Sequence, residues 1–96
     1  MNTEFVKALG YLDGEKYDKA EACLKKAIQI AKEEKRDYDL MEIYCCYGEF
    51  LAMVDRIDEA KKYLNEIVTY HDKTYECQTQ YDMAVELLNE LDEELW

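Results

Sequence analysis

The chain contains no proline, and only three of its 96 residues are glycine. Both residue types interrupt helices and form turns, so their scarcity leaves little material for the many tight turns of a β-sheet protein. Ala, Leu, Glu, Lys and Tyr are plentiful instead. Because most of these residues favour helix, the composition predicts an all-α protein. The length predicts one small domain over residues 1–96.

Long apolar runs are also absent, as none approaches the about 18 residues that a membrane-spanning helix needs. The N-terminal stretch MNTEFVK lacks the apolar core of a signal peptide. The four cysteines show no C-x-x-C pair and no matching histidine spacing, which disfavours a zinc site. We therefore predict a cytoplasmic protein with reduced, mostly buried thiols and without metal or cofactor. The alternative for the vicinal Cys45–Cys46 pair is a redox-sensing role.

Basic side chains are scarce, above all toward the C-terminus. Residues 1–48 carry a net charge of −2 and residues 49–96 a net charge of −9, and residues 75–96 contain seven acids without Lys or Arg. Nucleic acids and anionic membranes bind basic surfaces, so both are disfavoured as partners. A basic protein or peptide partner is compatible with this charge, as is a solvated acidic face without a partner.

Apolar residues at helical spacing predict five helices. The predicted helices run over about Thr3 to Leu12, Tyr17 to Lys35, Leu40 to Val54, from just after the DRID segment at 55–58 to about Tyr70, and from about 74 to Leu95.

Capping residues and glycines help to place the ends of these helices. The first helix is expected to begin with Thr3 as its N-cap and to stop at Gly14. The third, fourth and fifth helices have two candidate N-cap residues each: Asp37 or Asp39, Asp55 or Asp58, and Asp72 or Thr74, respectively. In the middle of the third helix, Gly48 indicates close approach of a neighbouring helix, because glycine there costs about 1 kcal/mol relative to alanine.

Two segments of the chain resemble each other at a distance of 40 residues. Residues 16–28 read KYDKAEACLKKAI and residues 56–68 read RIDEAKKYLNEIV. The correspondence extends to Ala8 with Gly48, Tyr11 with Leu51, Tyr17 with Ile57, Ala20 with Ala60, Leu24 with Leu64 and Ala27 with Ile67. Unrelated amphipathic helices would share the helical period but not this alternation of small and large residues. The pattern therefore predicts an internal repeat.

This alternation resembles the tetratricopeptide repeat (TPR) family. Small residues at 8, 20 and 27 and large ones at 11, 17 and 24 match its motif in the first unit. The second unit departs at Ile67, where the family has a small residue. Neither unit ends in the customary proline, since Lys32 and Asp72 stand there. The period is longer than the family's usual 34 or so residues, like the lengthened repeats of bacterial peptide-receptor regulators and signalling-protein sensor regions.

The resemblance implies an architecture and a binding surface. It implies two antiparallel helix pairs in a right-handed superhelical stack, with repeats at about 3–36 and 39–72 and a capping or linker helix at about 74–96. The first helix of each repeat would line a concave groove for a protein or peptide with apolar anchors and basic residues. The groove residues implied are Phe5, Leu9, Leu12, Asp13, Glu42, Cys45, Glu49 and Met53, with Asn2 and Ala52 beside them. The alternative is that these residues are merely exposed.

The last helix supports a second functional hypothesis. Its apolar residues recur at coiled-coil spacing: Cys77, Tyr81, Ala84, Leu88, Leu91 and Leu95. Such a helix follows the repeats in similar signalling proteins, where it dimerises or relays a signal. We therefore keep a sensor or dimerisation segment as the alternative function, with a possible homo-oligomer. Its predicted contact residues are Tyr81, Leu88, Leu91, Leu95 and Trp96, although packing of this stripe on the preceding helices is the simpler interpretation.

Signals of catalysis are missing from the sequence. The chain has a single histidine, His71, which its YHD context places at a surface or helix end. No segment resembles a phosphate-binding loop, a nucleophile elbow or a metal-binding motif. We therefore expect a non-catalytic protein.

Overall fold

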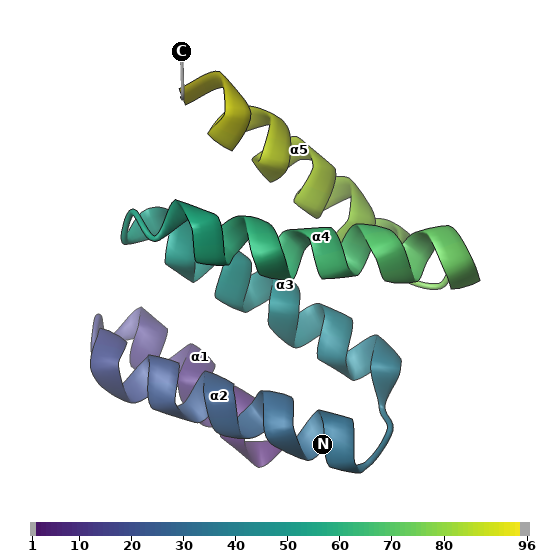
Figure 1. Cartoon of the computed structure of the whole chain (residues 1–96). Helices are drawn as coiled ribbons and strands as arrows, with labels where there is room; N and C mark the ends of the chain where they lie inside the picture. The colour runs from purple at the N-terminus through teal and green to yellow at the C-terminus, as the bar shows by residue number, and fades with distance from the viewer. Residues whose placement is uncertain (1, 95–96) are drawn as a thin grey trace. The chain divides into compact units, whose positions relative to one another are not determined.

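The computed structural model describes residues 2–94 and contains five α-helices and no strand among them (Figure 1). The prediction of an all-α fold is thus confirmed. The helices are α1 (Thr3–Asp13), α2 (Tyr17–Glu33), α3 (Asp37–Met53), α4 (Ile57–Thr74) and α5 (Gln78–Glu94). None of the helices within these residues is both long and apolar enough to cross a membrane.

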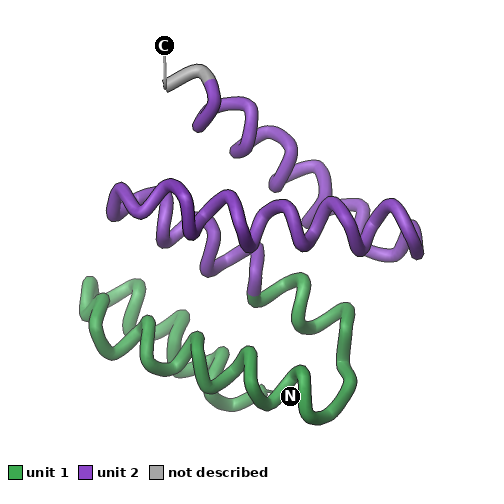
Figure 2. The backbone as a smooth tube through the Cα atoms, in the orientation of Figure 1, with its two compact units in different colours: residues 1–43 green, residues 44–96 purple. Residues whose placement is uncertain are grey.

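The chain divides into two compact units, and the division falls within α3 (Figure 2). The first unit, Met1–Ile43, holds α1, α2 and the beginning of α3. The second unit, Tyr44–Trp96, holds the remainder of α3 together with α4 and α5. Within the units, α1 packs on α2 and α4 packs on α5.

The first three helices end in the same type of turn. After α1, the Lys16 N–H donates to the Tyr11 carbonyl and the Glu15 N–H donates to the Leu12 carbonyl. These two bonds define a Schellman motif, which satisfies carbonyls that the end of a helix leaves unpaired. The same pair of bonds closes α2 at Lys35 and Arg36, and closes α3 at Asp55 and Arg56. Each helix therefore reverses into the next within three residues.

The residue in the left-handed conformation is not a glycine in any of these turns. It is Glu15, Lys35 and Asp55 in turn, with φ of 58°, 55° and 66°. Gly14 has an ordinary φ of −85°, so it precedes the left-handed position instead of occupying it. The prediction that Gly14 stops the first helix is thus correct in place but wrong in mechanism.

Several predicted helix starts differ from the observed ones. The N-cap of α1 is Asn2, whose side chain accepts a hydrogen bond from the Phe5 N–H, so Thr3 is already helical. Asp37 and Asp39 both lie in the first turn of α3, where carboxylates interact favourably with the helix dipole. The α4 helix starts after Arg56, without a side-chain cap, and continues past Tyr70 to Thr74.

Small residues mark the buried faces of the helices in each unit. In the first unit Ala8, Ala20 and Ala27 are 0% exposed. In the second unit a Cβ placed on Gly48 would lie 2.8 Å from the Leu64 Cδ2 atom, so α3 and α4 approach closely there and a side chain at this position would have to displace Leu64. This confirms the predicted close approach at Gly48. Tyr63 adds ring contacts to Tyr44 and Tyr47, at centroid distances of 5.0 and 4.9 Å.

Candidate functional site

A small hollow lies between α1 and the beginning of α3 in the first unit. Its volume is about 190 Å³. We call it the α1–α3 hollow, and it is lined by Asn2, Phe5, Val6, Asp39, Glu42 and Ile43. Phe5 and Val6 provide its apolar wall, and Val6 is half exposed. Two of the predicted groove residues, Phe5 and Glu42, thus line the same hollow.

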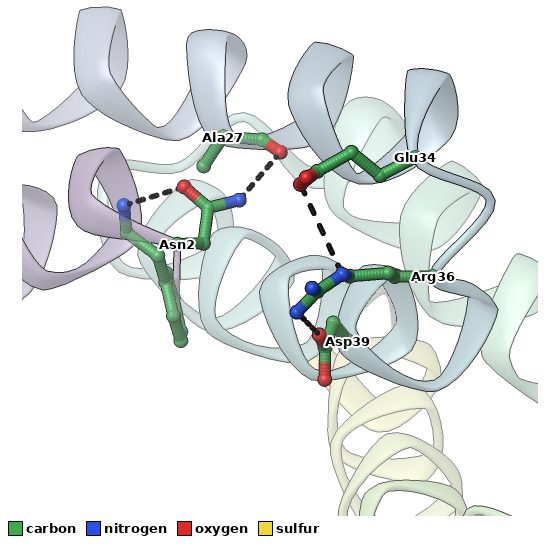
Figure 3. A network of polar contacts seen from close by, with 6 residues as sticks. Asn2, Ala27, Glu34, Arg36 and Asp39 are labelled. Atoms are coloured by element: carbon green, nitrogen blue, oxygen red, sulfur yellow. Dashed lines mark hydrogen bonds and ion pairs between the residues drawn. The ribbon is translucent and has the colours of Figure 1, made fainter.

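The polar groups around this hollow are largely occupied by bonds within the unit (Figure 3). The Asn2 side chain bridges two helices, because its oxygen caps α1 while its Nδ2 donates to the Ala27 carbonyl of α2 at 3.0 Å. The Asp39 carboxylate lies 3.6 Å from an Arg36 guanidinium nitrogen, and Arg36 also pairs with Glu34. Glu42 therefore remains as the carboxylate of this hollow without an ion pair among the described residues.

A second hollow of about 190 Å³ lies between α3 and α5 in the second unit. We call it the α3–α5 hollow, and it is lined by Glu49, Met83, Glu86, Leu87 and Glu90. Met83 and Leu87 lie one helical turn apart on α5 and supply the apolar surface, and Met83 is 44% exposed. Three carboxylates surround this surface, and no Lys or Arg within residues 2–94 forms an ion pair with any of them. The hollow is thus apolar inside and acidic at its edge.

The remaining predicted groove residues line neither hollow. Leu9 and Met53 are exposed at 43% and 58%, so they offer apolar surface. Asp13 is exposed and Leu12 is half-buried. Cys45 is buried at 6% exposure, and its Sγ lies 3.7 Å from the Glu49 carboxylate.

Sequence reasoning missed most residues of the α3–α5 hollow. On the last helix, the predicted contact residues belong to the stripe that starts at Cys77. The hollow is instead lined by the adjacent stripe, in which Met83 and Leu87 are four positions apart. That spacing, flanked by Glu86 and Glu90, was visible in the sequence as an apolar pair between acids. Val6, Asp39 and Ile43 of the α1–α3 hollow were missed as well.

The predicted contact stripe on the last helix is partly buried within its own unit. Cys77, Ala84 and Leu91 are 0%, 0% and 4% exposed. Tyr81 and Leu88 are half-buried. Leu95 and Trp96, the other two predicted contact residues, lie outside the described residues. The stripe thus contributes to the packing of α5 on α4.

Of the two environments predicted for His71, a surface or a helix end, the surface one is not observed, because His71 is buried at 7% exposure. It does lie in the last turn of α4. Its ring stacks on Tyr81 at a centroid distance of 4.0 Å, and Nε2 lies 3.0 Å from the Gln78 side-chain oxygen, to which it donates. Nδ1 is buried without a hydrogen-bond partner among the described residues. These contacts give His71 a packing role at the junction of α4 and α5.

The perturbed titratable groups also favour structural roles. Burial raises the pKa of the Cys77 thiol, and the nearby Glu76 raises it further. Desolvation likewise raises the pKa of Cys23, with a hydrogen bond to Glu4 acting in the same direction. Raised pKa values keep these thiols protonated at neutral pH, and thiolates are the reactive form of cysteine. No disulfide links the four cysteines, all of which lie within the described residues, and no described group of His, Cys, Asp and Glu side chains could hold a metal ion.

Comparison of the chain with protein-family models, with curated proteins and with solved structures finds no match in any of the three. The resemblance to tetratricopeptide repeats therefore stays a prediction from the residue pattern.

Proposed function

We propose that the protein is a non-catalytic scaffold that binds a protein or peptide, through the faces of α1 and α3 in the first unit and of α3 and α5 in the second. The observation that carries the proposal is the position of the two hollows, which lie between α1 and α3 in one unit and between α3 and α5 in the other. In a TPR-like repeat these are the first helices, whose faces would form the groove. Apolar pockets with a few polar groups are the usual form of binding sites.

The distribution of exposed apolar side chains supports this proposal. Within residues 2–94, six large apolar side chains are exposed, and five of them lie on α1, α3 and α5: Val6, Leu9, Tyr38, Met53 and Met83. The sixth, Tyr75, follows the end of α4, so none of these six lies on α2 or α4. Exposed apolar surface on one set of elements is typical of a protein interaction site.

The spacing of the turns supports a repeat of the TPR-like kind. The left-handed residues Glu15, Lys35 and Asp55 follow one another at intervals of 20 residues, half of the 40-residue period in the sequence. In stacked helical hairpins, both the side-chain pattern and the turns recur at one fixed period. The proposed setting is the cytoplasm, since reduced thiols fit a reducing compartment.

The alternative function, a sensor or dimerisation segment that acts through the last helix, has less support. Three members of its predicted contact stripe, Cys77, Ala84 and Leu91, are already buried within the second unit. Sedimentation across a concentration series separates the two proposals. Self-association that is lost in Leu88→Glu would favour the alternative, and a monomer at every concentration would exclude it.

The binding proposal is tested by affinity capture from the native cell followed by mass spectrometry. We expect Leu9→Glu combined with Met53→Glu to abolish capture of the specific partner while helicity is retained, because both side chains are exposed. The matched control, Ala22→Glu with Thr69→Glu, adds the same charge at exposed positions on α2 and α4. Unchanged capture by the Leu9 and Met53 variant would show that binding does not use these faces.

A further inference from the structure

We infer that the α3–α5 hollow binds a segment that presents one large apolar side chain flanked by Lys or Arg. This inference rests on the proposed binding function and assigns it a location and a partner chemistry. The volume of about 190 Å³ between Met83 and Leu87 suits a single large side chain, since a cavity of about 150 Å³ in another protein takes up benzene.

The acidic edge of the hollow determines the chemistry of the flanking residues. Glu86 and Glu90 are one turn apart on α5, an arrangement in which like charges destabilise a helix, and Glu49 faces the same hollow from α3. The segment from Tyr75 to Trp96 contains no base that could compensate them. A basic group bound between these carboxylates would therefore remove a repulsion as well as add an attraction.

Two other acidic groups on α5 have partners within the unit. Asp92 on α5 pairs with Lys61 of α4 at 2.9 Å, and Asp82 accepts a hydrogen bond from Gln78 at 2.8 Å. In the α1–α3 hollow, Asp39 is paired with Arg36. The α3–α5 hollow thus combines apolar surface with three carboxylates that have no ion pair among the described residues, whereas the α1–α3 hollow has one such carboxylate, Glu42.

Selection of a random peptide library on the immobilised full-length chain tests this inference. We expect the selected peptides to share a large apolar residue flanked by Lys or Arg. Replacing those bases by Gln in each peptide should weaken binding, and added salt should weaken the parent peptide more than its Gln version.

Variants of the hollow locate the binding. Glu86→Gln with Glu90→Gln should weaken binding about 3- to 10-fold at low ionic strength, the range expected for two exposed ion pairs. Met83→Ser should weaken it about tenfold through lost apolar contact. The control, Glu66→Gln with Asp72→Asn, removes the same charge from exposed positions on α4 and should leave binding unchanged. Circular dichroism confirms that each variant is folded, and the exposed Glu86 and Glu90 pair provides the test if Met83→Ser does not fold.

Three outcomes would overturn the inference in distinguishable ways. Selected peptides without a shared basic residue would contradict the partner chemistry. Basic peptides that bind equally well to the Glu86 and Glu90 variant and to the control would place the site elsewhere, while the binding function itself would stand. Failure to select any peptide above background would reject the binding function together with this site.

Discussion

At the scale of single residues, the helix ends carry a local conformational cost. Glu15, Lys35, Asp55 and Tyr75 all have φ between 55° and 66°. A side chain in this left-handed region places Cβ close to the following carbonyl oxygen, which costs about 1–2 kcal/mol and which glycine avoids. Each of these residues ends a helix, where the hydrogen bonds of the turn offset this cost.

Lys35→Gly is therefore expected to stabilise the protein by about 0.5–1 kcal/mol, the strain that is relieved less the added entropy of the unfolded chain. The matched control is Lys26→Gly, an exposed residue inside α2, where glycine should cost about 1 kcal/mol. Urea denaturation of both variants measures the two effects. If Lys35→Gly destabilises the protein as much as the control does, the assigned turn is incorrect.

The two helical glycines are expected to respond oppositely to a methyl group. A Cβ on Gly10 would meet nothing within 4 Å, so Gly10→Ala should stabilise by about 0.5–1 kcal/mol. A Cβ on Gly48 would lie 2.8 and 3.0 Å from Leu64 side-chain atoms, and Leu64 is fully buried. Gly48→Ala should thus lose about 1 kcal/mol, because overpacking outweighs the gain in helix propensity. Equal thermal shifts for the two variants would refute the close contact at Gly48.

The sequence was informative about burial at these positions and uninformative about turn geometry. The alternation of small and large residues predicted Ala8, Ala20 and Gly48 as close-contact positions, and each is buried. It could not predict left-handed Glu15 or Lys35, because these residue types carry no preference for that conformation. The predicted helix-end position of His71 agrees with the structure, but its burial was not predictable, since only the fold shows that the ring stacks on Tyr81.

At the scale of helices, Asn2 determines how α1 starts and how it is attached to α2. Its side chain accepts from the Phe5 N–H and donates to the Ala27 carbonyl. Asn2→Ala should cost about 1–2 kcal/mol, since a cap and a hydrogen bond between helices are lost together. Thr3→Ala should cost less than about 0.5 kcal/mol, because Thr3 is an exposed residue within the first turn. Denaturant titrations measure both losses of stability. A larger loss for Thr3→Ala than for Asn2→Ala would identify Thr3 as the N-cap.

The start of α5 gives a pH-dependent contribution to stability. Burial raises the pKa of Cys77 from its ordinary value of 9.0, so the folded state holds this proton more tightly than the unfolded state. The stabilisation is therefore complete below the unfolded pKa and is lost as pH rises through the folded pKa. Thermal melts that begin below pH 9 and extend above it should show a steeper fall for the wild type than for Cys77→Ala. Cys23 and Tyr44, whose pKa values are also raised, remain in both proteins, so equal slopes would contradict the role of Cys77.

Helix existence was easier to predict than helix ends. The apolar periodicity located all five helices, and the predicted start at Tyr17 agrees with the structure. The α3 helix begins at Asp37, three residues before the predicted Leu40, because the turn after α2 closes as soon as Arg36 donates to the Ala31 carbonyl. The α4 helix ends at Thr74, four residues after the predicted Tyr70, because no glycine or proline interrupts that segment.

At the scale of the whole molecule, the charge distribution is part of the proposed function. The net charge of −11 lies mostly in residues 49–96, and the carboxylates of the α3–α5 hollow belong to this half. A field of one sign accelerates association with a partner of opposite sign and is screened by salt. The candidate site was only partly predictable, because the TPR-like pattern identified Phe5, Glu42 and Glu49 but not the side chains of α5 that complete the second hollow.

The most direct test of the account is to map the surface that a partner covers. Backbone amide chemical shifts of the labelled chain are measured during titration with a captured partner or a selected peptide. We predict that the changes concentrate on α1, α3 and α5, with the largest ones at Glu49, Met83 and Glu90. Changes concentrated on α2 and α4 would contradict the proposed binding faces.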